Sequence, residues 1–211
     1  IHRKLSPFSI DDIGKPILSS GISIGTTDRN DPLFIGIQTD DEGCVLPHSD
    51  IIQQGVLNQI LTDNYHSQLM NLPPSSSART ESFLKPIQPR MHGLYIKSGR
   101  MDPEEIIESV SYGVFAKEFG DGKVYFENSS FSFSVQEAYL IENGKITAPL
   151  GRLTLRGNIR EVMESVQMIG NDFRYDKGVS YCFKNGQSLN VRVGQPTIKI
   201  EGITVSGSSY D

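Results

Sequence analysis

The chain has 211 residues, a formal net charge of −5, 20 glycines and 11 prolines. This length is enough for one large domain with its own hydrophobic core, and the Gly and Pro content favours a turn-rich β or α+β domain over a helical bundle. The acidic balance, with no basic cluster, argues against a protein that binds nucleic acid through its phosphates. No apolar run approaches the ~18 residues that a membrane span needs.

The number of cysteines indicates the cellular compartment in which the protein is expected to work. Cys44 and Cys182 are the two cysteines of the chain, and two cysteines do not make a disulfide framework. We therefore expect a cytoplasmic protein.

The first third of the chain predicts short elements separated by loops. Residues 1–31 are expected to form an irregular polar entry segment with one short strand at 22–25. We then expect a buried strand at Leu33–Ile37, a solvated turn at Thr39–Gly43, a hairpin across 51–61 with Gly55 at a positive φ, and a short helix at 63–70 with Asp63 as its N-cap.

The segment Asn71–Arg79 contains two prolines and three consecutive serines. This composition is typical of a flexible, exposed loop. The alternative is a mobile flap that faces a substrate. In that case Arg79 would contact a carboxylate or a main-chain carbonyl of a bound peptide.

The remainder predicts two helices among antiparallel strands. One helix is expected at 103–110, capped by Asp102 with Pro103 in its first turn, and another at 159–168, capped by Asn158. The predicted strands are 114–119 and 124–127 around a Gly120–Gly122 turn, 131–135, a hairpin of 138–142 and 146–150 around Asn143-Gly144, and the closing strands 189–193 and 197–203. The expected fold is α+β, a mainly antiparallel, barrel-like sheet domain with two or three short helices.

Few residues suggest chemistry by their spacing. The sequence has no phosphate-binding Gly-rich loop, nucleophile elbow, C-x-x-C pair or HExxH motif. Cys44 and His48 are four residues apart, but Pro47 disfavours a shared helical face. Asp40, Asp41 and Glu42 could form a cation site or an acid–base pair, although adjacent carboxylates are more typical of a solvated turn. Cys182 alone, on a predicted strand, is typical of a packed core residue.

Several blocks of the sequence resemble one known family, the TldD/PmbA proteins, also called modulators of DNA gyrase. The blocks are Asp40–Gly43, Arg79–Ser82, Glu137-Ala-Tyr-Leu-Ile-Glu-Asn-Gly-Lys-Ile-Thr147, Met168–Asp172, Gly186-Gln-Ser and Val193-Gly-Gln-Pro-Thr197. Together they cover nearly the whole chain and are similar to the C-terminal domain of the family, so residues 1–211 are expected to form that domain.

The resemblance implies a zinc metallopeptidase that cleaves unfolded peptides and acts as a homodimer or as a heterodimer with a PmbA-type (TldE-like) subunit. In the TldD-type proteins two histidines of a His-Glu-x-x-x-His helix and one late cysteine hold the zinc, and Cys182 matches that cysteine. Three protein ligands leave a coordination position for water, whose pKa the metal lowers towards ~7. The Glu of the motif would accept its proton.

The sequence lacks the His-Glu-x-x-x-His motif. The resemblance places this helix upstream of Ile1, so the chain alone is expected to be inactive and without zinc. The alternative function is a non-catalytic family member that completes the substrate chamber of a partner. A third possibility, a DNA-associated regulator, conflicts with the acidic charge.

Overall fold

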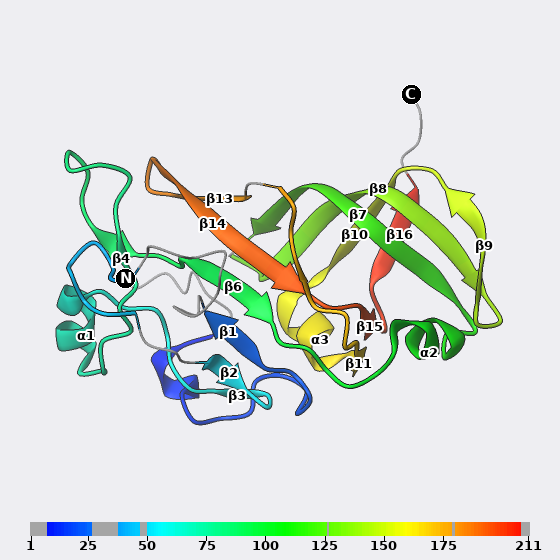
Figure 1. The fold of residues 1–211 in the computed structure, drawn as a ribbon, viewed down its shortest axis with the longest axis horizontal. Helices are drawn as coiled ribbons and strands as arrows, with labels where there is room; N and C mark the ends of the chain where they lie inside the picture. The colour runs from blue at the N-terminus through cyan, green and yellow to red at the C-terminus, as the bar shows by residue number, and fades with distance from the viewer. Residues whose placement is uncertain (1–7, 27–37, 47–49, 126, 179, 208–211) are drawn as a thin grey trace.

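The computed structural model describes residues 8–26, 38–46, 50–125, 127–178 and 180–207 (Figure 1). The strand predicted at Leu33–Ile37 and the residue His48 lie outside these ranges. No helix in the described ranges is long and apolar enough to cross a membrane.

The described residues form short helices and many strands (Figure 1). The helices are a 3-10 turn η1 (Ile10–Asp12), α1 (Asn64–Met70), α2 (Pro103–Glu108) and α3 (Ile159–Glu164). The strands are β1 (Ile24–Thr26), β2 (Asp50–Gln53), β3 (Val56–Leu57), β4 (Ala78–Arg79), β5 (Gln88–Pro89), β6 (Gly93–Ile96), β7 (Tyr112–Tyr125), β8 (Ser130–Glu142), β9 (Lys145–Leu150), β10 (Leu153–Asn158), β11 (Val166–Ile169), β12 (Arg174–Tyr175), β13 (Ser180–Lys184), β14 (Gln187–Gln195), β15 (Ile198–Ile200) and β16 (Thr204–Gly207).

Two larger sheets organise these strands. A seven-stranded sheet has the order β12-β14-β6-β1-β2-β3, with β13 paired to β14, and a five-stranded sheet has the order β16-β10-β8-β7, with β9 paired to β8. Every pairing is antiparallel except β14 with β6, which is parallel. The expected α+β class with mainly antiparallel sheets is confirmed, and the described strands do not close into a barrel.

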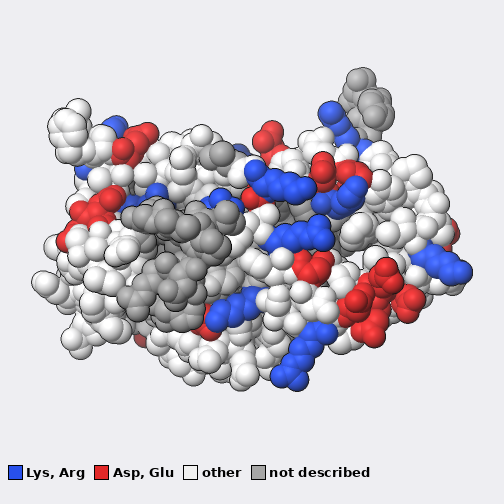
Figure 2. Space-filling view, viewed as in Figure 1, with Lys and Arg blue, Asp and Glu red and all other residues white. Residues whose placement is uncertain are grey.

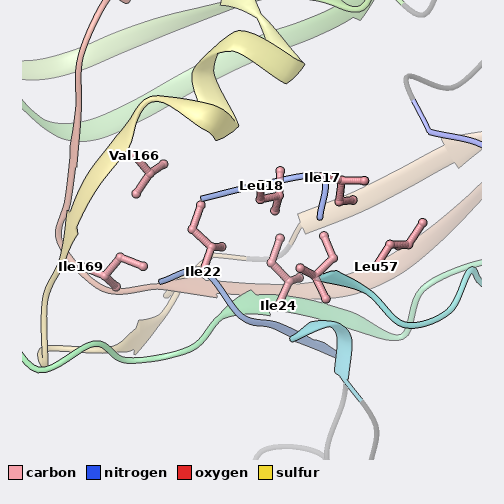
Figure 3. Close-up of a cluster of buried hydrophobic side chains, with 8 residues drawn as sticks. Ile17, Leu18, Ile22, Ile24, Leu57, Val166 and Ile169 are labelled. Carbon is pink, nitrogen blue, oxygen red and sulfur yellow. The ribbon is translucent and has the colours of Figure 1, made fainter. Parts of the chain in front are cut away.

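The main hydrophobic core lies where the β1–β3 end of the first sheet meets the segment after α3 (Figure 3). Ile22 is 1% exposed and Leu57 3% exposed. From the other side Val166 and Ile169 of β11 complete the cluster. Residues from both ends of the chain thus share one core, as expected for a single domain.

The tight turns follow the sequence closely. The residue pairs Gln54-Gly55, Asn143-Gly144 and Asn185-Gly186 each connect two antiparallel strands, and all six residues have a positive φ. A two-residue turn of this kind needs left-handed backbone at both positions, which Asn and Gly adopt readily. The hairpins predicted at Gly55 and Asn143-Gly144 are confirmed.

The predicted helix starts are also confirmed. Asp63 accepts a hydrogen bond from the His66 amide at the start of α1, and Asp102 accepts one from the Glu104 amide at the start of α2. Asn158 caps α3 in the same way through the Arg160 amide. Each short polar side chain satisfies an amide that the first helical turn leaves without a partner.

Two predicted element lengths are wrong. The Gly120–Gly122 segment is not a turn, because β7 runs continuously through it and only its register against β8 shifts there. The predicted helix 159–168 ends at Glu164, and the apolar residues that follow form β11 instead. Here pairing with β15 outweighs a local pattern that fits a helix.

The predicted exposed loop at 71–79 is exposed at residues 71 and 73–74, but the prediction is wrong for its second half. Ser75 and Ser77 are 6% and 4% exposed, and Ala78 is fully buried. The Ser75 hydroxyl accepts from the Thr62 amide at 2.6 Å and donates to the Thr62 carbonyl. These serine hydroxyls replace water as partners of buried main-chain groups, so a polar composition does not produce an exposed loop here.

Candidate functional site around Cys182

Cys182 lies in the middle of β13, directly opposite Leu189 of β14. Residues that face each other across an antiparallel pair point to the same side of the sheet, and Leu189 is 8% exposed. The half-buried Cys182 side chain therefore points towards the covered face. Its neighbours Tyr181 and Phe183 point to the other face, where they are 54% and 76% exposed.

Gln187, the first residue after the Asn185-Gly186 turn, holds the hairpin in place. It is 2% exposed. Its Oε1 accepts from the Glu81 amide at 2.9 Å, and its Nε2 donates to the Pro86 carbonyl at 2.8 Å. The resemblance block Gly186-Gln-Ser thus fixes the loop 80–87 against the β13–β14 hairpin that carries Cys182.

Residues of the segment 88–90 also form hydrogen bonds with β13 and with the turn that follows it. The Arg90 guanidinium donates from Nη2 to the main-chain carbonyl of Cys182. Lys184 Nζ donates to the Pro89 carbonyl at 3.0 Å, and Asn185 Nδ2 donates to Gln88 Oε1 at 2.8 Å. The strand that carries Cys182 is therefore held both by its pairing with β14 and by a row of side-chain hydrogen bonds with the segment 88–90.

Arg79, the residue predicted to contact substrate, reaches the same neighbourhood. Its Nη1 donates to the Met91 carbonyl at 2.6 Å. Burial lowers the pKa of Arg79, the Asp41 carboxylate and Cys182 raise it, and Arg90 lowers it further. The structure thus places Arg79, Arg90 and Cys182 within electrostatic reach of one another.

His92 is a buried histidine beside this group. It is 8% exposed, and neither ring nitrogen has a hydrogen-bond partner in the structure. Burial and the positive charge of Arg79 lower the pKa of His92 to about 4, so the ring is neutral at pH 7. It borders a small pocket that is also lined by Met91, Leu46, Leu61, Thr26 and the serines 75–77.

Among the described residues, Cys182 belongs to no group of three possible metal ligands. The only group of three possible metal ligands there is Asp40, Glu42 and Cys44, whose ligand atoms lie within 4.8 Å of one another. Since zinc in proteins takes three or four protein ligands, the described residues do not by themselves form a zinc site at Cys182.

In the Asp40–Glu42–Cys44 group, both carboxylates accept hydrogen bonds from main-chain amides, and these bonds would compete with metal binding. Asp40 Oδ1 accepts from the amides of Glu42 and Cys44, and its Oδ2 accepts from the Ala78 amide. Glu42 Oε2 accepts from the Asn64 amide at the start of α1. The prediction of a fully solvated turn is wrong for Asp40, which is 4% exposed, because these main-chain amides replace water around its carboxylate.

Sequence reasoning missed Gln88, Arg90 and His92. The three residues alternate along the segment of β5 and β6 and are all buried, at 8%, 2% and 8% exposure. Alternation of this kind marks one face of an extended segment, but polar residues at these positions predict an exposed face. Only the fold shows that the face is covered.

Comparisons with known proteins converge on one family. The model of the PmbA/TldA metallopeptidase C-terminal domain matches residues 1–207. A protein of Buchnera aphidicola named "Metalloprotease TldD homolog" is 36% identical over 98% of this chain and 43% of its own length. A Saccharolobus solfataricus protein named "Zinc metalloprotease TldD homolog" is 33% identical over 80% of this chain and 37% of its own length.

One solved structure has a closely similar fold. The crystal structure of TldE from Thermococcus kodakarensis superposes with a TM-score of 0.79, covering 96% of this chain and 43% of that chain, at 20% identity. At that identity the similarity shows the fold alone. The chain thus spans less than half the length of these relatives.

Proposed function

The chain belongs to the PmbA/TldA metallopeptidase family and corresponds to its C-terminal domain, and from this premise we propose that it is the C-terminal part of a zinc-dependent peptidase that cleaves unfolded peptides or small proteins. The observation that carries the proposal is the 36% identity with a protein named as a TldD metalloprotease, which extends over 98% of this chain. The name of the Saccharolobus relative supports zinc as the metal.

In this proposal Cys182 supplies one thiolate ligand. Two features favour Cys182 over Cys44: its position three residues before the start of the Asn185–Ser188 block that carries the resemblance, and the β14 pairing and Arg90 hydrogen bond that hold its backbone. The remaining ligands would come from elsewhere in the full-length protein. Bound zinc would supply Lewis-acid activation of water and of a peptide carbonyl.

We assign Arg79 to substrate contact. The Arg79 side chain is half-buried, and its guanidinium donates one hydrogen bond, to the Met91 carbonyl. The other N–H groups of a guanidinium can donate to a carbonyl or to a carboxylate. A heterodimer with a TldE-like subunit, or a homodimer, would enclose the peptide.

The second candidate is a non-catalytic subunit that completes the substrate chamber of a partner. It rests on the name of one solved structure of similar fold, TldE, whose 20% identity to this chain shows a shared fold and not a shared role. It predicts a full-length protein that binds no zinc and cleaves no peptide alone, but that supports cleavage when a catalytic partner is added.

The experiment that separates the two candidates uses the full-length protein. We would measure bound zinc and the cleavage of an unfolded casein fragment before chelation, after chelation and after zinc is restored. The peptidase proposal predicts near-stoichiometric zinc, with activity that disappears on chelation and returns with zinc. Stoichiometry near zero, with cleavage only after a partner subunit is added, would favour the scaffold.

A further inference from the structure

Three cationic side chains from separate segments gather beside Cys182. Arg79 comes from β4, Arg90 follows β5, and Lys184 ends β13. The Arg90 guanidinium donates to the Cys182 carbonyl, Lys184 Nζ donates to the Pro89 carbonyl, and Arg79 Nη1 donates to the Met91 carbonyl. All three cations thus meet at the segment 89–91, and we call them the Arg79–Arg90–Lys184 cluster. Burial lowers the pKa values of Arg79 and Lys184, and both residues are close enough to Arg90 and Cys182 for the charges of those two groups to shift these pKa values as well.

Among the described residues, no carboxylate forms an ion pair with the cluster. The ion pairs within the described ranges involve other residues: His66 with Asp63, Lys97 with Asp50, Lys117 with Glu137, and Arg160 with Asp12. Two acidic groups lie near enough to raise the pKa of a cluster member, Asp41 for Arg79 and Asp63 for Lys184. Neither is in an ion pair with a cluster member: Asp41 accepts from the Thr80 amide and Asp63 is paired with His66, so both act on the cluster from a longer distance.

The cluster also retains hydrogen-bond donors. Arg90 is 2% exposed, yet its Nε and Nη1 have no partner in the structure. For Lys184 the structure shows one hydrogen bond, to Pro89, out of the three that an ammonium can donate. A buried cation without a counter-ion is strongly unfavourable. This positive potential sits beside Cys182 in a chain whose net charge is −5.

We propose that the Arg79–Arg90–Lys184 cluster is a binding site for a carboxylate of a peptide, either its C-terminal carboxylate or an acidic side chain. The inference rests on the proposed peptidase function, because that function makes peptides the ligands. The half-buried Arg79 and the exposed Lys184 would contact the carboxylate. Arg90 beneath them would strengthen the attraction, since charges interact more strongly in a poorly solvated interior.

The test measures binding rather than turnover. Fluorescein-labelled peptides are titrated into the full-length protein with a metal chelator present. One pair of peptides differs only in a C-terminal acid or amide, and a second pair only in an internal Glu or Gln. The variants are Arg79→Met combined with Lys184→Met, and Arg90→Met alone. The matched control is Lys145→Met, which removes an exposed lysine of β9, at the other end of the molecule (Figure 1).

The proposal predicts that the wild-type protein binds the carboxylate form of at least one pair about tenfold more tightly than the neutral form at low salt, as expected for a charge-assisted hydrogen bond. The preference should fall to within about twofold in both cluster variants and persist in Lys145→Met. It should also weaken as salt increases, because screening acts on an electrostatic preference. Whichever pair shows the preference identifies the source of the carboxylate.

Three outcomes would overturn the proposal. The first is equal binding within both pairs by the wild-type protein. The second is an undiminished preference in the double variant, checked by its thermal melting curve to be folded. The third is a preference insensitive to salt in the wild-type protein. The chelator prevents metal-dependent cleavage of the peptides during the binding measurement. A failure of the peptidase proposal would instead be seen as a full-length protein without zinc and without activity, and it would leave the binding result unchanged.

Discussion

The Arg90 guanidinium donates a hydrogen bond to the main-chain carbonyl of Cys182, a residue 92 positions later in the chain. The strand β13 is also paired residue by residue with β14, from Ser180 opposite Val191 to Lys184 opposite Gln187. The backbone at Cys182 is thereby held by two independent sets of contacts. A metal ligand benefits from such fixation, because groups around the ligand determine where its donor atom points.

Asp40 is predicted to contribute to stability through its three main-chain hydrogen bonds. We expect Asp40→Ala to lower the free energy of unfolding by about 3 kcal/mol, because it leaves amides without a charged acceptor in a buried position. Urea unfolding measures this loss. Glu81→Gln, a change at an exposed residue, is the control and should stay within about 0.5 kcal/mol of wild type. An unchanged midpoint for Asp40→Ala would refute the structural role.

A matched pair of glycines tests the turn geometry. Gly144 and Gly186 occupy the second position of their Asn-Gly turns at φ +76° and +71°. A Cβ at Gly186 would meet nothing within 4 Å, whereas a Cβ at Gly144 would lie 2.7 Å from the Glu108 carbonyl oxygen. We expect Gly186→Ala to cost about 1–2 kcal/mol from left-handed backbone alone, and Gly144→Ala about 1–3 kcal/mol more from the clash.

Urea unfolding of the two glycine variants side by side provides the measurement. The larger loss must belong to Gly144→Ala. Equal losses, or a larger loss for Gly186→Ala, would show that the Asn143-Gly144 turn does not pack against the end of α2 as described.

His92 is predicted to make stability depend on pH. Its folded pKa of about 4 lies below the ordinary 6.5, so between these values the unfolded chain binds more protons than the folded one. Stability therefore rises with pH across this window and is lost as pH falls from 6.5 towards 4. The contribution between pH 7 and pH 5 is at most about 2 kcal/mol.

The measurement for His92 compares unfolding free energies at pH 7 and pH 5 in the wild-type protein and in His92→Gln, which cannot titrate. Carboxylates titrate in both proteins and cancel in the comparison. The wild-type protein should lose about 2 kcal/mol more than the variant on acidification. Identical losses in the two proteins would contradict the buried, neutral state of His92.

The sequence predicts correctly those parts of the fold whose conformation is determined by residues close together in the chain. The Asn-Gly and Gln-Gly turns and the caps at Asp63, Asp102 and Asn158 depend on residues within a few positions of one another. Where pairing with another strand determines the backbone conformation, the local sequence pattern predicts the wrong element. Gly120–Gly122 fits a turn by composition but continues β7 because β8 pairs across it.

The site was only partly predictable for the same reason. Cys182 could be selected through the family resemblance and Arg79 by interpreting the segment 71–79 as a flap, and the structure brings both residues beside the segment 90–91. Arg90 carries no local signal, since an arginine in a polar segment predicts solvent exposure. Its burial and its bond to Cys182 depend on a contact between distant segments, which no window of the sequence contains.

The metal content of a pair of cysteine variants tests the central claim most directly. Cys182→Ser and Cys44→Ser are made in the full-length protein, and bound zinc is measured by mass spectrometry together with cleavage of an unfolded peptide. Loss of one thiolate from a three-ligand site should remove most of the zinc and the activity from Cys182→Ser, whereas Cys44→Ser should retain both. Zinc and activity that persist in Cys182→Ser at the level of Cys44→Ser would contradict the assignment of Cys182 as a ligand.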